Sequence, residues 1–328
     1  MQGLHRPLVV QTLPDPTPGP GEIVLKVGRC GICGSDLHMT EEPAFGCKPG
    51  DVLGHEFAGE VVALGQGVTS LKSGDLVSAV PLVGCGHCPS CLAGEPAWCP
   101  EFGLQGGGYA EYVRTRAAQC VRLPRSASLA DGAIIEPLAV ALHGVTLAEL
   151  KQGDRVLVLG AGPIGLAVAF WARRHGATRV VVQDIVPHQQ ARALAMGATD
   201  FIVDREDPVG AAGRALGGKA DIVFECVGVP GLIEQAARQV RVKGTVLILG
   251  LCTRPDSFVP FEVLSKELRL QTSAFFKRQE YEAALDALDA GAAQPRLLVT
   301  DTVSLEQVPE SFEALKHRTH HCKVLIAP

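Results

Sequence analysis

The feature that most constrains the fold is a regular alternation of apolar strands and helices, which begins near Val140. The expected strands and helices follow one another along the chain as residues 155–159, 163–175, 179–183, 188–196, 201–203, 221–225, 231–240, 245–249, 268–272 and 279–290. Such a succession is typical of βαβ units, in which helices join parallel strands and cover the sheet. The second half of the chain is therefore predicted to be of class α/β, with a doubly wound parallel sheet.

The residues before about 130 have a different character. They are rich in Gly and Pro and carry short strand-like runs such as 22–27, 57–62 and 109–113. Closely spaced strands with turn residues between them favour an all-β, barrel-like domain. A chain of 328 residues also exceeds what one core comfortably serves. We expect three segments: a β-barrel domain over 1–137, a domain built on the parallel sheet over 138–277, and a return to the first domain over 278–328.

A glycine-rich turn marks the expected dinucleotide site. Residues 160–165 fit the pattern G-x-G-x-x-G, directly after an apolar strand and directly before a helix. The glycines allow a tight turn, a close approach of the backbone to a pyrophosphate, and packing of helix on strand. Asp184 ends the next strand, where its carboxylate can accept the ribose hydroxyls and would repel a 2′-phosphate. We expect NAD rather than NADP, bound by Gly160, Gly162, Pro163, Ile164, Gly165 and Asp184.

Four cysteines crowd into residues 85–99, as Cys85, Cys88, Cys91 and Cys99. Four thiolates at these spacings can close a tetrahedron around Zn²⁺ with no open position, which is typical of a structural site. An iron–sulfur cluster is the competing interpretation, because similar spacings hold such clusters. In a reducing compartment this clustering indicates a metal rather than disulfides.

A second candidate metal site combines two separate segments, one with Cys33 and one with His55 and Glu56. A thiolate, an imidazole and a carboxylate would leave the fourth position of a zinc ion open for water or an alcohol. Such a zinc acts as a Lewis acid that lowers the pKa of the alcohol, so that hydride can pass to a nicotinamide. Each residue alone would be a packed cysteine or a surface histidine, but their occurrence beside a nucleotide motif favours catalysis.

Charge and hydropathy exclude other classes of function. The net charge of −5 is spread without clustered Lys and Arg, which argues against a nucleic-acid surface. The apolar stretches 156–170 and 244–251 are short and interrupted by Gly, so no membrane span is expected. The first ten residues lack the pattern of a signal peptide, and we expect a cytoplasmic protein.

The segments GICGSDLH, GHEFAGEV, the cysteine cluster, EPLAVALHG and GAGPIG together resemble the zinc-dependent medium-chain dehydrogenase/reductase (alcohol dehydrogenase) family. They occur in the order of that family, and the resemblance covers essentially the whole chain. It implies a GroES-like β-barrel catalytic domain plus a Rossmann domain, two zinc ions per subunit, and a homodimer or homotetramer. The sequence is most similar to the sorbitol and butanediol dehydrogenase-like branch.

The resemblance also implies roles for particular residues. Cys33 and His55 match the catalytic zinc ligands, Ser35 the hydroxyl that binds the substrate alcohol, and His38 the residue that relays its proton. Asp36 matches the carboxylate that orients the ligand histidine. The third zinc ligand is Glu136 or Glu56; we favour Glu136, with Glu56 behind it or alternating with it.

The same resemblance places further residues around the substrate and the nicotinamide. Lys277 could reach a second hydroxyl of the substrate, although it could also be an ordinary solvated lysine. The segments that pass close to the nicotinamide contain Val227 and Leu249, Gly250 and Leu251. The predicted function is oxidation of a secondary alcohol or polyol by NAD. An L-threonine dehydrogenase or an NADPH-preferring aldehyde or ketone reductase is the alternative within the family, and a non-enzymatic zinc protein the alternative outside it.

Overall fold

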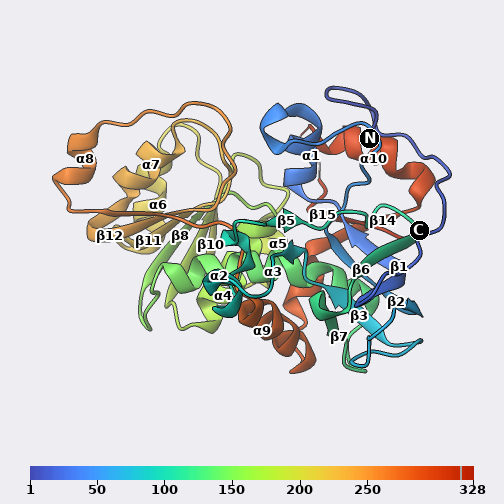
Figure 1. The fold of residues 1–328 in the computed structure, drawn as a ribbon. Helices are drawn as coiled ribbons and strands as arrows, with labels where there is room; N and C mark the ends of the chain where they lie inside the picture. The colour runs from blue at the N-terminus through green and yellow to red at the C-terminus, as the bar shows by residue number, and fades with distance from the viewer. Residues whose placement is uncertain (318–319) are drawn as a thin grey trace. The chain divides into compact units, whose positions relative to one another are not determined.

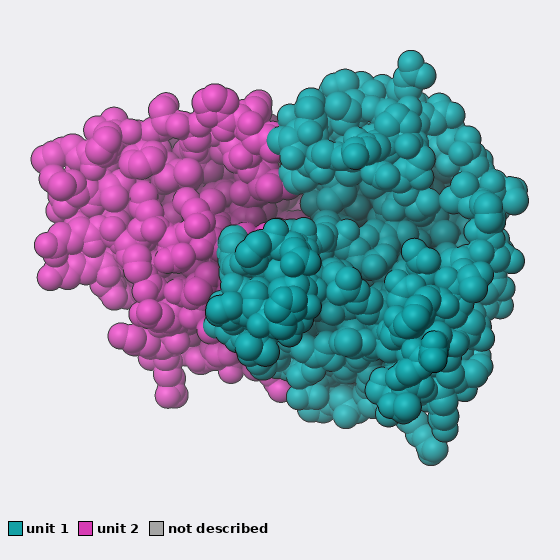
Figure 2. Space-filling view, viewed as in Figure 1, with its two compact units in different colours: residues 1–136, 277–292, 299–328 teal, residues 137–276, 293–298 magenta. Residues whose placement is uncertain are grey.

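The computed structural model describes residues 1–317 and 320–328, and these form two compact units (Figure 2). Unit 1 comprises Met1–Glu136, Lys277–Ala292 and Val299–Pro328, and unit 2 comprises Pro137–Phe276 and Ala293–Leu298. The segment expected to return to the first domain is thus interrupted. Ala293–Leu298 belongs to unit 2, where the Leu297 carbonyl accepts a hydrogen bond of 2.8 Å from Arg192 Nε.

A seven-stranded sheet forms the core of unit 1, in the order β14-β15-β1-β2-β3-β7, with β6 also paired to β1. The strands of this unit, including a separate β4-β5 pair, are β1 (Glu22–Gly31), β2 (Glu56–Leu64), β3 (Leu76–Ala79), β4 (Leu82–Val83), β5 (Gly103–Leu104), β6 (Tyr112–Arg116), β7 (Cys120–Arg122), β14 (Val299–Val303) and β15 (Lys323–Ile326). Its helices are α1 (Gly34–Glu41), α2 (Pro89–Leu92), α9 (Arg278–Asp289) and α10 (Val308–Leu315), with 3₁₀ turns at Pro43–Phe45, Pro96–Trp98, Ala117–Gln119 and Leu305–Gln307.

The long strand β1 leads into the segment that contains Cys33, one of the predicted zinc ligands. Its pairing with β2 shifts register twice, between Val24 and Leu25 and again before Arg29. Such bulges bend a strand and increase its twist. Beyond them Gly31, the last residue of β1, lies opposite Glu56, the first residue of β2. The sheet therefore brings the two sequence segments with the predicted zinc ligands to one edge.

The strand expected at 109–113 begins later than predicted. β6 starts at Tyr112, and the residues before it run alongside Leu53 and Gly54 through backbone hydrogen bonds rather than in a sheet. Three consecutive glycines at 106–108 explain the difference, because Gly disfavours a regular strand and allows close backbone approach. Tyr109 is thus held beside the residues that precede His55.

Unit 2 is built on a six-stranded parallel sheet in the order β10-β9-β8-β11-β12-β13. Its strands are β8 (Arg155–Leu159), β9 (Arg179–Gln183), β10 (Asp200–Ile202), β11 (Ala220–Glu225), β12 (Val240–Ile248) and β13 (Arg269–Thr272). Helices lie on both sides of the sheet (Figure 1), namely α4 (Pro163–Arg174), α5 (Gln190–Ala195), α6 (Pro208–Leu216), α7 (Leu232–Gln239) and α8 (Pro260–Leu264), with a 3₁₀ turn at Gln294–Leu298. This topology confirms the doubly wound sheet predicted from the sequence. Its strand order reverses between β8 and β11, the place where such folds bind ligands.

Helix α3 (Leu129–Leu147) begins in unit 1 and continues into unit 2. By length and composition it could cross a membrane, but 72% of its most apolar window is buried inside the structure. That burial is typical of a core helix, and the alternation of strands and helices did not predict it.

Candidate active site

Three predicted zinc ligands meet at one edge of the sheet in unit 1. Cys33 precedes α1 in an extended conformation, and His55 and Glu56 lead into β2. The Cys33 sulfur, a ring nitrogen of His55 and a carboxylate oxygen of Glu56 all lie within 4.8 Å of one another. A set of one sulfur, one nitrogen and one oxygen donor suits Zn²⁺, and three protein ligands are typical of a catalytic site. The residues present therefore fit the ion.

Asp36 holds two of these ligands in place. It is fully buried, and its Oδ2 accepts a hydrogen bond of 3.0 Å from the Cys33 backbone N–H. Its Oδ1 lies 3.4 Å from His55 Nδ1, which leaves Nε2 of the ring for a metal. Burial opposes ionisation of Asp36, but His55, Tyr109 and Cys33 outweigh it and lower the pKa of this carboxyl. Burial also opposes the charged form of His55 and so acts to lower its pKa, but Asp36 and Cys33 outweigh burial and raise this pKa well above the usual value.

Lys323 is a buried partner of Glu56 that sequence reasoning missed. Its Nζ donates to Glu56 Oε1 at 2.7 Å, to Oε2 at 2.8 Å and to the Ile32 carbonyl at 2.9 Å. These three acceptors match the three donors of a lysine ammonium. A lysine at the start of the apolar run 323–326 was the only available signal in the sequence.

Glu136 lies on α3, next to Pro137, and is 7% exposed. It does not belong to the group of donors that Cys33, His55 and Glu56 form. Burial raises the pKa of Glu136 to about 7; His55 acts against this rise and Glu56 adds to it. The structure thus groups Glu56 with the other two ligands, whereas the sequence favoured Glu136.

Ser35 and His38 both lie on α1, the helix that follows Cys33, and both are half-buried. Residues three apart on a helix share one face, so the hydroxyl and the imidazole follow each other along the same side. The His38 ring also lies 6.2 Å, centroid to centroid, from the ring of Phe45.

The four cysteines of residues 85–99 form the second group of donors, and their sulfurs lie within 4.8 Å of one another. Backbone N–H groups point at these sulfurs: Cys85 and Glu101 each donate to Cys99 Sγ at 3.3 Å. A hydrogen bond from Gly86 lowers the pKa of Cys91, but burial and the other three thiols outweigh it and raise this pKa to about 11. Four crowded sulfurs with N–H donors around them fit a closed, tetrahedral Zn²⁺ site.

Lys277 is engaged with this cysteine segment. Its Nζ lies 2.6 Å from Glu95 Oε1, and the next backbone N–H, of Arg278, donates to the Gly94 carbonyl at 3.2 Å. An ordinary structural role for this lysine therefore competes with the predicted contact to substrate.

The glycine motif of unit 2 forms a tight turn into a helix. Gly160 has a φ of +96°, and α4 begins at Pro163 with Gly162 at its N-cap. A Cβ on Gly165 would lie 2.0 Å from the Gly160 carbonyl oxygen, so no larger residue fits there. Asp184 Oδ2 accepts a hydrogen bond of 2.8 Å from Ala161 N–H, which ties the carboxylate to the glycine turn.

Glu225 organises the two segments predicted to pass close to the nicotinamide, and sequence reasoning missed it. Its Oε1 accepts hydrogen bonds from Val227 N–H at 2.7 Å and from Gly228 N–H at 2.9 Å. Its backbone carbonyl accepts from Gly250 N–H at 2.9 Å. A Cβ on Gly228 would lie 2.6 Å from the backbone of Leu251, so the two segments are in close contact.

Comparison with known families and proteins shows what the whole chain is similar to. Residues 19–125 match the family "Alcohol dehydrogenase GroES-like domain", and residues 163–290 match the family "Zinc-binding dehydrogenase". Sorbitol dehydrogenase of Bacillus subtilis is 32% identical over 98% of this chain and 95% of its own length. (R,R)-butanediol dehydrogenase of the same organism is 32% identical over 97% of this chain and 96% of its own.

Solved structures of similar proteins match the chain over almost its whole length. An alcohol dehydrogenase (rspB) of Escherichia coli CFT073, complexed with NADH, superposes with a TM-score of 0.87 at 29% identity, over 95% of this chain and 94% of that one. A putative zinc-binding dehydrogenase of Sinorhizobium meliloti, bound to NADP, does so with a TM-score of 0.87 at 33% identity, over 96% and 94%. These likenesses confirm the fold class predicted from the sequence.

Proposed function

The chain belongs to the zinc-dependent medium-chain alcohol dehydrogenase family, in its sorbitol and butanediol dehydrogenase branch, and from this premise we propose which residues perform its chemistry. It is an oxidoreductase of alcohols or polyols that uses zinc and a nicotinamide cofactor, as the sequence predicted. The proposal depends above all on one observation, the Cys33, His55 and Glu56 donors within 4.8 Å of one another.

We propose that Cys33, His55 and Glu56 hold the catalytic zinc, with Glu136 as the alternative third ligand in place of Glu56. Zinc bound there supplies a Lewis acid for the alcohol oxygen, and the nicotinamide accepts the hydride. Ser35 holds the alcohol group and receives its proton, and His38, one turn further along α1, passes that proton towards solvent. Cys85, Cys88, Cys91 and Cys99 hold a second, structural zinc.

The third ligand can be tested by zinc content. Glu56→Gln should lower bound zinc from two per subunit to about one, because its oxygens belong to the donor group. Glu136→Gln should keep both ions, because its carboxylate lies outside that group. The opposite result, with zinc lost only in Glu136→Gln, would assign the third ligand to Glu136.

We propose a secondary alcohol or a polyol as substrate, in keeping with the sorbitol and butanediol dehydrogenases that the chain resembles. The test is NADH production over a panel of diols, sugar alcohols, threonine and cyclic or aryl secondary alcohols. Cys33→Ser should abolish activity, and Cys252→Ser, an exposed cysteine of unit 2, is the matched control. Activity that survives Cys33→Ser with zinc still bound would contradict the proposal.

We propose NAD rather than NADP as the cofactor. The Asp184 carboxylate is fixed at the end of β9 by the N–H groups of Ala161 and Ile185, at 2.8 and 2.6 Å. A fixed negative charge at this position repels a 2′-phosphate. Comparison of kcat/KM for NAD and NADP tests this, and Asp184→Ser should narrow the difference between the two.

We further propose a homodimer or homotetramer that works in the cytoplasm. β13 is an edge strand of the unit 2 sheet, and near it Phe261 and Leu264 of α8 are 69% and 72% exposed. Large exposed apolar side chains favour association. Comparison of the sedimentation coefficients of the wild type and of the double variant Phe261→Ser/Leu264→Ser tests whether these side chains hold an oligomer together. Among the residues that the structure describes, no two cysteines are joined in a disulfide, which suits a reducing compartment.

A further inference from the structure

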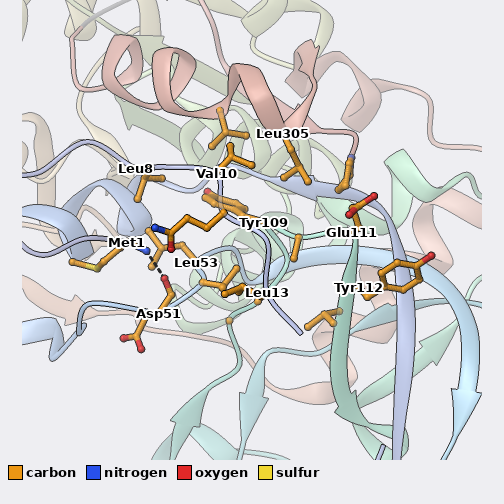
Figure 3. A pocket seen from close by; sticks show the side chains of 18 of the residues that line it. Met1, Leu8, Val10, Leu13, Asp51, Leu53, Tyr109, Glu111, Tyr112 and Leu305 are labelled. Atoms are coloured by element: carbon orange, nitrogen blue, oxygen red, sulfur yellow. Dashed lines mark hydrogen bonds between the residues drawn. The ribbon is translucent and has the colours of Figure 1, made fainter. Parts of the chain in front are cut away.

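Tyr109 lies between a cavity and the metal-binding residues of unit 1. The cavity has a volume of about 830 Å³, and its lining includes Leu53, Gly107 and Tyr109 (Figure 3). One side of the Tyr109 ring therefore belongs to this cavity. The ring also lies against Gly54, the residue before His55, and its hydroxyl group is directed at Asp36.

The position of the Tyr109 ring is fixed by its backbone and by Gly54. Tyr109 N–H donates to the Leu53 carbonyl at 3.0 Å, and Gly108 N–H donates to the Gly54 carbonyl at 2.9 Å. Gly54 has a φ of +88°, and a Cβ on it would lie 2.3 Å from Tyr109 Cδ1. The ring is thus packed against the residue that directly precedes His55.

The hydroxyl group of Tyr109 donates to Asp36 Oδ2 at 2.7 Å. The same oxygen accepts the Cys33 N–H at 3.0 Å, while the other oxygen lies 3.4 Å from His55 Nδ1. Because Asp36 is 0% exposed, bulk water does not reach its carboxylate in place of a lost donor. The orientation of the carboxylate therefore depends on the two donors to Oδ2.

We propose that Tyr109 is a positioning residue of the catalytic zinc site, because its hydroxyl group fixes the rotation of the Asp36 carboxylate. With Oδ2 held by Tyr109 and Cys33, the other oxygen stays directed at His55. This proposal rests on the proposed function, in which Cys33 and His55 are zinc ligands. A phenylalanine would fill the same space but leave Cys33 N–H as the one remaining donor to Oδ2 among the bonds described above, so a role of Tyr109 in packing alone predicts no effect of that change.

The test compares Tyr109→Phe with Tyr112→Phe in the zinc-loaded enzyme. Tyr112 lines the same cavity and is 37% exposed, which makes it a matched control. Groups that orient metal-bound histidines are worth about 10- to 100-fold in metal affinity. Tyr109→Phe should therefore speed the loss of zinc from the catalytic site to a chelator by about tenfold. It should also change the absorption spectrum of the Co²⁺-substituted catalytic site, while the four-cysteine site and Tyr112→Phe stay as in the wild type.

A second variant tests whether Tyr109 acts through Asp36. Asp36→Asn should itself speed zinc loss, and adding Tyr109→Phe to it should have little further effect, as expected of residues in one network. Wild-type zinc loss and an unchanged Co²⁺ spectrum in Tyr109→Phe would overturn the proposal, as would fully additive effects. A wild-type enzyme that holds only the four-cysteine zinc would overturn the proposed function itself, and the role of Tyr109 with it.

Discussion

Replacement of Lys323 by methionine should leave the buried carboxylate of Glu56 without its positively charged partner. Lys323 is 2% exposed and Glu56 1% exposed, and the ammonium donates to both carboxylate oxygens and to the Ile32 carbonyl. Methionine keeps most of the apolar stem, so the change removes the charge more than the packing. Breaking a buried pair in this way costs about 3–5 kcal/mol.

Proton uptake limits the part of that cost that comes from the unpaired charge. A buried carboxylate without a positively charged partner takes up a proton. For a free glutamic acid, whose pKa is about 4.3, this uptake costs about 1.4 kcal/mol for each pH unit above that pKa. The limit is about 3.7 kcal/mol at pH 7 and about 1 kcal/mol at pH 5. The destabilisation of Lys323→Met should therefore grow as pH rises. When Lys323→Met is introduced into the Glu56→Gln variant, the destabilisation should be smaller and independent of pH.

Hydrogen exchange of the β15 and β2 amides measures this effect locally, which matters because the chain has two units that need not unfold together. A chelator keeps the protein metal-free. Lys316→Met is the control: its side chain is 18% exposed and pairs with Glu41 and Glu313 near the surface, where about 1 kcal/mol or less is expected. A loss below about 1 kcal/mol for Lys323→Met at pH 7, or equal losses at pH 5 and 7, would refute the reasoning.

Three further variants test other contacts. Burial raises the pKa of Asp221, but Arg241 and Arg155 outweigh it and lower this pKa, so the stabilisation from the ionised carboxylate is present above the usual carboxyl pKa and is lost as pH falls through the lower native value. In urea unfolding, Asp221→Asn should therefore cost about 1 kcal/mol at pH 7 after solvent screening, and nothing near pH 2. Gly54→Ala should cost about 2–4 kcal/mol of stability and release the catalytic zinc, because the φ of Gly54 is +88° and the added Cβ meets the Tyr109 ring. Calorimetry measures the loss of stability and metal analysis the loss of zinc, and a variant that keeps both zinc ions would contradict the prediction. Cys91→Ser should leave about one zinc per subunit and a lower Tm, and retention of both ions would exclude the four-cysteine site.

Local patterns predicted the parts of the fold and site that are local in the chain. The glycine turn at 160–165 and the four cysteines of 85–99 depend on spacing within a few residues, and the structure places them as short-range chemistry dictates. The parallel sheet followed in the same way from the alternation of strands and helices.

Contacts between distant residues could not be predicted in this way. Lys323 and Glu56 are 267 positions apart, and Tyr109 and Asp36 are 73 apart, so no periodicity or spacing links them. The choice between Glu56 and Glu136 depends on a packing that only the folded sheet defines. Lys277 was assigned to the substrate by resemblance, which carries no information on Glu95, its partner in the structure.

The place of β15 between β14 and β1 has a consequence for biosynthesis. Glu56 leaves the ribosome long before Lys323 is made, so the nascent sheet holds a carboxylate whose ammonium partner does not yet exist. All of unit 2 is encoded between them and is synthesised in the meantime. Maturation of the proposed zinc site is therefore expected to be a late event, coupled to insertion of β15 between β14 and β1.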